Sequence, residues 1–283
     1  MSLRIFTNIL SENAQRVLEL SNSMLGRSIS RISSGIRVQN ASDDAAALSV
    51  TEKLRADVRT LAQGARNLGD GLSLLSVAEG AMGEQSEILI RMRELASQAA
   101  TGTIGTTERQ TLNLEFAALR AEFDRIANVT EFNGERLLNG NLASSSSNPL
   151  ILQVGDSTSV NDRINLNTEV DLTAVTSTAL GFSGSNISTE TDALSSLDNL
   201  TGAIDQLIQV RARLGATQQR LTRALNNLNV SIENLNSAVS QIRDADLAEE
   251  VAILTKNQIL VQSGAAMISQ SNLIPQSVLT LLA

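Results

Sequence analysis

Two adjacent carboxylates, Asp43 and Asp44, lie in the segment NASDDAAALSV and could do acid–base or metal chemistry if their side chains converged. Successive residues of a helix point about 100° apart, however, and no second carboxylate cluster is adjacent in sequence. Ser42 is a favourable N-cap, and acidic residues in a first helical turn interact well with the helix dipole. The pair therefore indicates the start of a long helix and not a catalytic or metal-binding dyad.

A second acidic run, RDADLAEE at residues 243–250, contains Asp244 and Asp246 at the spacing of the first ligands of a calcium-binding loop. Leu247 and Ala248 stand where such a loop needs further oxygen ligands and a glycine turn, so no metal site is predicted. We instead expect the two acidic segments to form a joint between helices. Its residues are Ser42, Asp43, Asp44, Asp244 and Asp246.

The composition excludes most enzyme chemistry. The chain of 283 residues has no histidine and no cysteine, which excludes serine–histidine–aspartate triads, thiol nucleophiles, disulfides and the common zinc sites. We therefore expect no catalysis and no bound cofactor or metal. The net charge of −8 disfavours nucleic acid as a partner, because the surface would repel its phosphates. Arg27 and Arg31 share one helix face, which we interpret as a solvated or subunit-contact face.

No segment predicts a membrane span. The apolar cluster LIPQSVLTLLA at residues 273–283 is interrupted and shorter than the roughly 20 residues that a span needs. The N-terminal segment MSLRIFTNILSENAQR is interrupted by polar residues, so we expect no cleavable signal peptide. Other protein chains are the favoured partners.

Heptad periodicity is the clearest structural signal. Between residues 197 and 242, apolar residues recur in alternating steps of three and four, interrupted only by Arg211 and Gln218. This pattern keeps one helix stripe against a partner and predicts a rod of about 70 Å. The same spacing from Leu54 to Leu89 predicts a second long helix over residues 42–100. Its five glycines would permit close backbone approach. They are Gly64, Gly69, Gly71, Gly80 and Gly83.

The remaining segments complete a mainly α fold of long antiparallel helical rods. An amphipathic pattern predicts a third helix over residues 107–126. The segments LILQVG and RINL alternate around the turn GDSTSVND, as a β-hairpin does, within a loop region over residues 141–196. We expect this region to form a small cap without a core of its own.

Two further helices, one near each end of the chain, are expected to pack as a coiled coil. They are short, so they can bury little apolar surface against each other, and we expect assembly to order them. The apolar residues assigned to this packing are Leu18, Leu25, Ile29, Ile32, Leu247, Val251, Leu254, Val261 and Ile268. The division therefore places a terminal-helix domain at 1–42 and 243–283 and a helical core domain at 43–242.

The chain resembles bacterial flagellin. The resemblance rests on specific motifs covering roughly residues 1–140 and 196–283, and on a central region far shorter than the outer variable domains of many flagellins. The motifs are SMLGRSISRISSGIRVQNASDDAAALSV, GARNLGDGLSLLSVAEGAM, RMRELASQAA, FDRIANVTEFNGERLLNG, LQVG and IRDADLAEEVAILTKNQIL. The resemblance implies a short flagellin without outer domains, whose terminal helices form the inner tube of a helical homopolymer used for swimming.

The resemblance also implies partners and a location. A flagellin is exported through the flagellar type III secretion apparatus and is located in the flagellum, outside the cell or in the periplasm of a spirochaete. Its other partners are the flagellar cap protein, the hook–filament junction protein and an export chaperone on the C-terminal segment, here Leu247 to Ala283. Host Toll-like receptor 5 recognises many flagellins at a surface that also packs between subunits. The matching residues are Arg91, Leu95 and Glu115, whereas Ile90, Met92 and Ser97 depart from the usual pattern.

Two alternative assignments fit the sequence less well. The hook–filament junction protein shares the terminal helices, but its match to the SDDAA and LAEE runs is poorer and its central region is usually larger. A flagellin with a metalloprotease insert needs a histidine motif for zinc, which a chain without histidine cannot supply.

Overall fold

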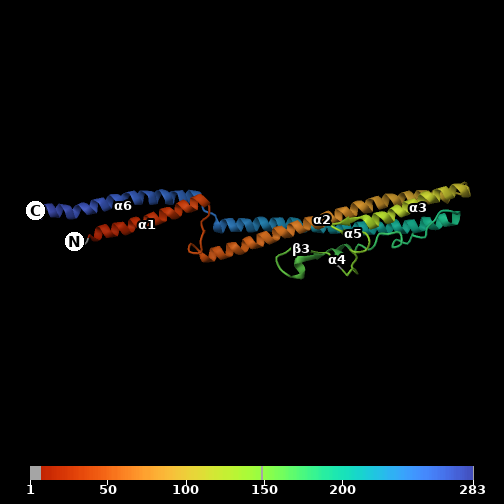
Figure 1. Cartoon of the computed structure of the whole chain (residues 1–283), viewed down its shortest axis with the longest axis horizontal. Coiled ribbons are helices and arrows are strands. Elements are labelled where there is room, and N and C mark those ends of the chain that lie inside the picture. The colour runs from red at the N-terminus through yellow and green to blue at the C-terminus, as the bar shows by residue number, and fades with distance from the viewer. Residues whose placement is uncertain (1–7, 148, 283) are drawn as a thin grey trace. The chain divides into compact units, whose positions relative to one another are not determined.

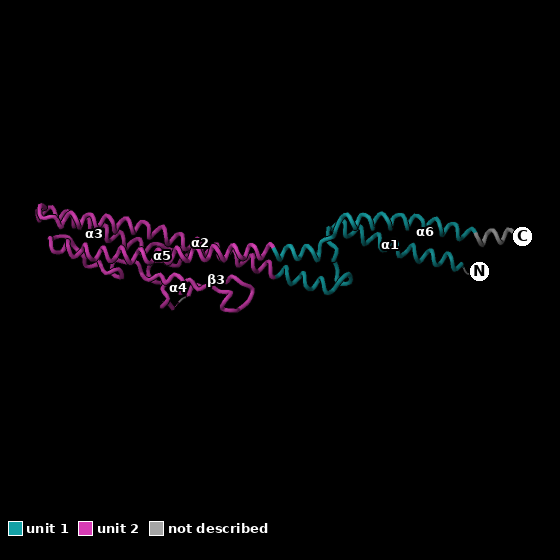
Figure 2. The backbone as a smooth tube through the Cα atoms, turned by 180° about the vertical axis from the view of Figure 1, so that it is seen from behind, with its two compact units in different colours: residues 1–56, 234–283 teal, residues 57–233 magenta. Residues whose placement is uncertain are grey.

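The chain folds into two compact units. The computed structural model describes the backbone of residues 8–147 and 149–282, and the side chains of that range up to residue 273. Residues 1–56 and 234–283 form one unit, here called the terminal unit, and residues 57–233 form the central unit (Figure 2). The expected domain limits at residues 42 and 243 remain a prediction. Two helices, α2 (Ala45–Ala99) and α5 (Glu190–Arg243), contribute residues to both units.

Helices α2 and α5 run antiparallel, and one pair of polar residues in their heptad seams forms a hydrogen bond. Gln218 of α5 donates from Nε2 to Glu79 of α2 at 3.0 Å. Arg243 donates to Glu52 at 3.1 Å in the terminal unit, so residue numbers rise along one helix as they fall along the other. Every predicted seam position is buried or half-buried. The heptad reading is therefore confirmed, and the polar pair fixes the register of the two helices.

The core of the central unit lies between α2, α5, α3 (Thr106–Val129) and the loops that follow α3. Phe123 of α3 packs edge-on against Phe182, with ring centroids 5.2 Å apart. Buried Gln85 of α2 donates from Nε2 to the carbonyl oxygens of Phe123 and Val175, both at 3.1 Å. One side chain thus joins a long helix, the third helix and a loop. Figure 1 shows α3 beside α2 and α5.

Two small antiparallel strand pairs follow α3. The expected hairpin is present as β3 (Ile151–Gln153) and β4 (Arg163–Asn165), and Leu152 pairs with Ile164. The 3-10 turn η1 (Val160–Asp162) precedes β4, and the short helix α4 (Leu166–Val170) follows it. The pair of β1 (Glu131–Phe132) and β2 (Glu135–Arg136) was not anticipated. Asn133 and Gly134 connect these strands with φ angles of 51° and 82°, and an Asn-Gly pair with positive φ is the usual signal for such a turn.

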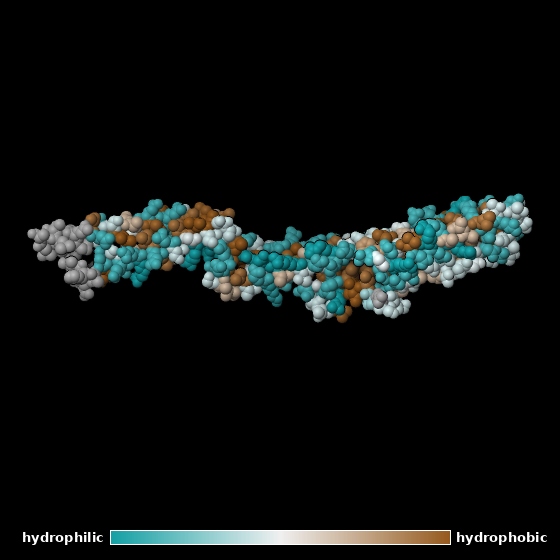
Figure 3. All heavy atoms as spheres, viewed as in Figure 1, coloured by the Kyte–Doolittle hydropathy of each residue, from teal (hydrophilic) through white to brown (hydrophobic). Residues whose placement is uncertain are grey.

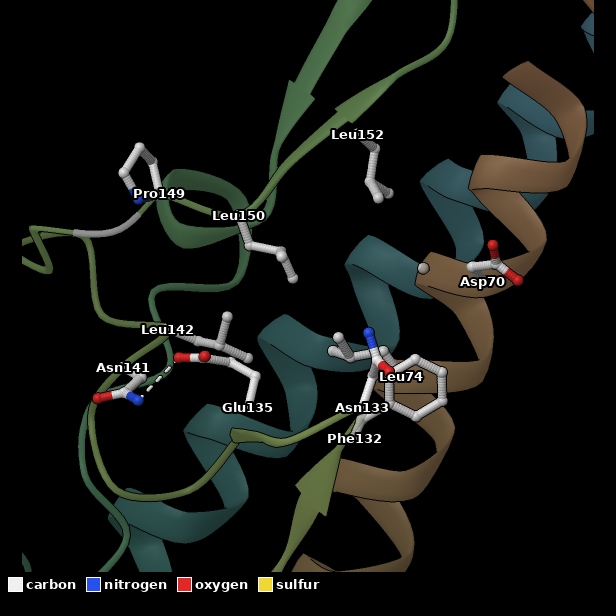
Figure 4. Close-up of a pocket in the computed structure, with 11 residues that line it drawn as sticks. Asp70, Leu74, Phe132, Asn133, Glu135, Asn141, Leu142, Pro149, Leu150 and Leu152 are labelled. Atoms are coloured by element: carbon white, nitrogen blue, oxygen red, sulfur yellow. Dashed lines mark hydrogen bonds between the residues drawn. The ribbon is translucent and has the colours of Figure 1, made fainter. Parts of the chain in front are cut away.

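The loop region packs on α2 instead of forming a core of its own. Leu142, Leu150 and Leu152 line one side of a cavity of about 380 Å³, and Leu74 of α2 and Phe132 line the other (Figure 4). Asn67 of α2 donates to the Gln153 carbonyl oxygen at 2.8 Å. These contacts tie the hairpin to the helix.

Glycines in α2 permit this close packing at two of the five predicted positions. A Cβ at Gly64 would overlap the Val154 carbonyl oxygen, and a Cβ at Gly71 would overlap a methyl group of Leu152. A Cβ at Gly69, Gly80 or Gly83 would meet no atom of the described residues within 4 Å. The predicted backbone approach is therefore confirmed at Gly64, whereas the close neighbour of Gly71 is a side chain, and the prediction is wrong for the other three glycines within the described residues.

Candidate assembly surface

Backbone hydrogen bonds form the joint between the terminal helices and the long helices. Helix α1 (Ile9–Ser34) ends at Gly35, which adopts the left-handed conformation with φ of 70°. Arg37 N–H donates to the Arg243 carbonyl oxygen at 2.7 Å, and Ala245 N–H donates to the Gly35 carbonyl oxygen at 2.9 Å. The linker after α1 is therefore held, antiparallel, to the linker after α5.

The acidic residues of the joint accept hydrogen bonds from the backbone. Asp44 accepts from Ala47 N–H at 2.9 Å and is the N-cap of α2, so the expectation that Ser42 has this role is wrong. Asp43 instead accepts from the N–H groups of Gln39 and Asn40 in the preceding turn. Asp246 caps α6 (Leu247–Leu282) by accepting from Ala248 N–H at 2.8 Å. The carboxylates next to the two helix starts thus satisfy orphan N–H groups.

Charged side chains connect the helices on either side of the joint. Arg31 of α1 donates to Glu250 of α6 at 3.0 Å, and the Glu250 side chain is only 7% exposed. Asp244 accepts from the Ser240 hydroxyl at 2.6 Å within the last turn of α5. In the part of the chain that the structure describes, no three acidic side chains gather as metal ligands would.

Helices α1 and α6 lie side by side and pack along a seam of alternating small or polar and apolar residues (Figure 1). They run antiparallel, since Asn8 donates to the Ser271 carbonyl oxygen at 3.0 Å near one end and Arg31 contacts Glu250 near the other. The seam residues are Ser11, Ala14, Leu18, Ser21, Leu25, Ser28 and Ile32 on α1, and Glu250, Leu254, Asn257, Val261, Gly264, Ile268 and Ser271 on α6. The sequence pattern predicts only the apolar members of this seam, because its serines and asparagine carry no hydrophobic signal.

Three predicted packing residues lie outside the seam. Ile29, Leu247 and Val251 are about half exposed, so their assignment to packing between α1 and α6 is wrong for the single chain. They are part of a set of exposed apolar residues on the outer faces of the two helices. Figure 3 shows one side of this surface. The other members are Ile9, Leu10, Val17, Leu20, Met24, Ile253, Ile259, Leu260, Met267 and Leu273. We call this set the outer apolar surface.

The predicted receptor-contact residues are only partly on the surface. Arg91 of α2 donates to Glu115 of α3 at 2.8 Å and to Glu94 at 3.2 Å, and these bonds raise the pKa of the Arg91 guanidinium above its ordinary value, the Glu115 bond most. Leu95 is 1% exposed and lies in the core. Of the three residues matched to receptor contacts, Arg91 and Glu115 are thus exposed in the single chain and Leu95 is buried, and the role of all three in recognition remains a prediction.

These features together define a long-helix structural protein with paired terminal helices. A model of the bacterial flagellin N-terminal helical region matches residues 5–143, and one of the flagellin C-terminal helical region matches residues 197–282. The chain is 39% identical to a flagellin of Halalkalibacterium halodurans over 275 residues, covering 97% of this chain and 98% of that one. The chain belongs to the bacterial flagellin family. It is a structural subunit of the flagellar filament and serves motility.

Other relatives refine this assignment. The chain is 37% identical to flagellin FlaB2 of Treponema pallidum over 288 residues, again covering 97% and 98% of the two chains. A solved hook-associated protein of Vibrio parahaemolyticus, 16% identical, matches with a TM-score of 0.57 over 71% of this chain and 100% of that one, which shows a shared helical fold only. The hook–filament junction alternative has no support from the family models. No helix among the described residues is long and apolar enough to cross a membrane.

Proposed function

We propose that this flagellin polymerises through the outer apolar surface of α1 and α6. The observation that carries the proposal is the inverted polarity of the terminal unit, in which serines are buried along the α1–α6 seam and large apolar side chains are exposed. Residues of the outer apolar surface are between 37% and 63% exposed. Soluble monomers rarely keep large contiguous apolar patches, and burial yields about 25 cal/mol per Å². Copies of the same chain can cover this surface in a helical polymer.

Self-assembly of the purified chain tests this proposal. Protein precipitated with ammonium sulfate and redissolved should form long tubular filaments visible by negative-stain electron microscopy, with light scattering that rises above a critical concentration. Salting-out strengthens apolar burial, so sulfate should promote assembly. Failure of the intact chain to form filaments across protein concentrations would refute the proposal.

We propose further partners from the family membership and the terminal unit. Export through the flagellar type III secretion apparatus would place the subunit in an extracellular filament, or in a periplasmic one if the source is a spirochaete, as the relatives from Treponema suggest. An export chaperone would cover the C-terminal segment 247–283, whose final side chains lie outside the described residues. The cap protein and the hook–filament junction protein would meet the filament at its two ends. The joint residues would hold the terminal helices to the core domain.

Recognition by Toll-like receptor 5 is proposed for the surface that contains Arg91 and Glu115, with buried Leu95 supporting the helix from inside. Arg91→Ala should reduce signalling of the monomer in receptor reporter cells by about tenfold, the size expected for loss of a contact worth roughly 1.4 kcal/mol. Arg93→Ala is the matched control, since Arg93 is exposed two residues away and should change signalling less than twofold. Equal responses from both variants would exclude this role for Arg91.

A further inference from the structure

A groove between α1 and α6 brings basic side chains of both helices together. Arg27 and Arg31 of α1 and Lys256 of α6 line this groove, which has a volume of about 350 Å³. Lys256 is one of only two lysines in the chain. The groove thus collects positive charge in a protein whose net charge is −8.

Two of these cations have no partner of their own. Arg31 is paired with Glu250 at 3.0 Å. The side chains of Arg27 and Lys256 make no hydrogen bond and no salt bridge to any of the described residues. Their positive charges are therefore available to a group from outside the chain.

A buried amide in the same groove also lacks a partner. Asn257 is 3% exposed and lines the groove beside Lys256, and its Nδ2 has no acceptor within the described part of the chain. An unsatisfied buried donor costs about 1–3 kcal/mol. An acceptor oxygen that enters the groove would pair with the two cations that lie beside this amide.

We propose that the groove binds a carboxylate of a second copy of this chain, supplied by Glu12 or Glu19 of that copy's α1. This inference rests on the proposed polymerisation. Both glutamates are exposed, and their carboxylates have no hydrogen-bond or salt-bridge partner among the residues that the structure describes. Within one chain, Glu12 and Glu19 lie about 22 Å and 12 Å from Arg27 along the helix, beyond the spacing at which side chains of one helix pair.

The surroundings of the groove favour a second copy over a free anion. Exposed Met24, Ile253 and Leu260 line the groove beside the cations. Glu19 is next to exposed Leu20 and two residues from exposed Val17, so the same stretch offers an acid and apolar side chains. Phosphate would satisfy the charges but would leave the apolar lining in water. In a polymer of identical copies, each chain can place one of its glutamates in the groove of a neighbour and bind a glutamate of another neighbour in its own groove.

Charge reversal of Lys256 tests the proposal against a matched control. Lys256→Glu should raise the critical concentration for polymerisation at least tenfold, measured by light scattering at low ionic strength, and Lys256→Gln should raise it less. Lys53→Glu makes the same charge change at the other lysine, which is exposed and outside the groove, and should stay within about twofold of the unmodified chain. Added salt should reduce the difference in critical concentration between Lys256→Glu and the unmodified chain, because salt screens exposed charges.

A reciprocal change identifies the occupant. Glu12→Lys and Glu19→Lys, introduced together into the Lys256→Glu chain, should restore most of the lost assembly. Lys256→Glu assembling like Lys53→Glu would overturn the groove as a binding site. A defect that the reciprocal changes do not relieve would overturn the assignment to Glu12 or Glu19. Failure of the unmodified chain to assemble would instead refute the proposed function itself.

Discussion

Deletion of residues 1–35 should abolish filament formation and leave the central unit folded. The core residues of that unit lie between Leu68 and Leu221, and none of them belongs to α1 or α6. The deletion removes the seam partner of α6 and half of the outer apolar surface. A single helix without a partner is only marginally stable in water. Polymerisation should fall below detection at concentrations where the intact chain is fully assembled.

Deletion of residues 250–283 is the matching experiment, because it removes the other member of the same helix pair. At low temperature, the circular dichroism spectra of both variants should lack the helical signal that the terminal pair contributes to the intact chain. On heating, both variants should show one cooperative unfolding transition, that of the central unit. Electron microscopy should show no filaments from either. Filaments from either truncated chain would contradict the claim that polymerisation needs both terminal helices. Loss of the cooperative transition would contradict the claim that the central unit folds without them.

Gly64→Ala should destabilise the central unit, whereas Gly69→Ala should not. Both changes add the same methyl group to the same helix and should gain up to about 1 kcal/mol from helix propensity. At Gly64 the methyl overlaps the Val154 carbonyl oxygen, which is backbone and cannot rotate away, and overpacking typically costs about 1–3 kcal/mol. At Gly69 it meets no described atom within 4 Å. Gly64→Ala should therefore lower the free energy of unfolding, whereas Gly69→Ala should leave it unchanged or raise it.

Urea denaturation monitored by circular dichroism measures this difference. The free energy of unfolding of Gly64→Ala should be lower than that of the unmodified chain, by up to about 2 kcal/mol once the gain in propensity is subtracted. Gly69→Ala should match the unmodified chain or exceed it by up to about 1 kcal/mol. Equal stability of the two variants would show that the hairpin moves away from α2 without cost.

Much of the fold could be predicted because the long helices repeat one simple pattern many times. The heptads of α2 and α5 gave the helices, their partner faces and the end of α5 at Arg243. The second buried stripe of α5, formed by Ser196, Ala203, Val210 and Thr217, was missed because two of its members are polar and one is alanine, so the stripe has only a weak hydrophobic signal. The same reason hid the serines of the α1–α6 seam.

The candidate site was harder to predict than the helices. Asp44 and Ser42 are both good N-cap residues, and only the position of the first helical turn shows that Asp44 has this role. Ile29 and Leu247 match a coiled-coil pattern by residue type, yet they lie on the outer surface. Residue type and spacing locate a helix, but they do not decide which face meets the partner when both faces carry apolar residues.

The sequence by itself determined the mainly helical fold, the break in periodicity near residues 243–247 and the lack of histidine and cysteine chemistry, since these depend on composition and local spacing. Only the tertiary structure decided which glycines the hairpin needs, which carboxylates cap helices, and that Leu95 is buried while the apolar residues of α1 and α6 face outward. The physical reason is that these properties depend on atoms brought together from distant parts of the chain. Glu250, for example, is buried in the seam between α1 and α6, where it pairs with Arg31, more than 200 residues earlier in the chain.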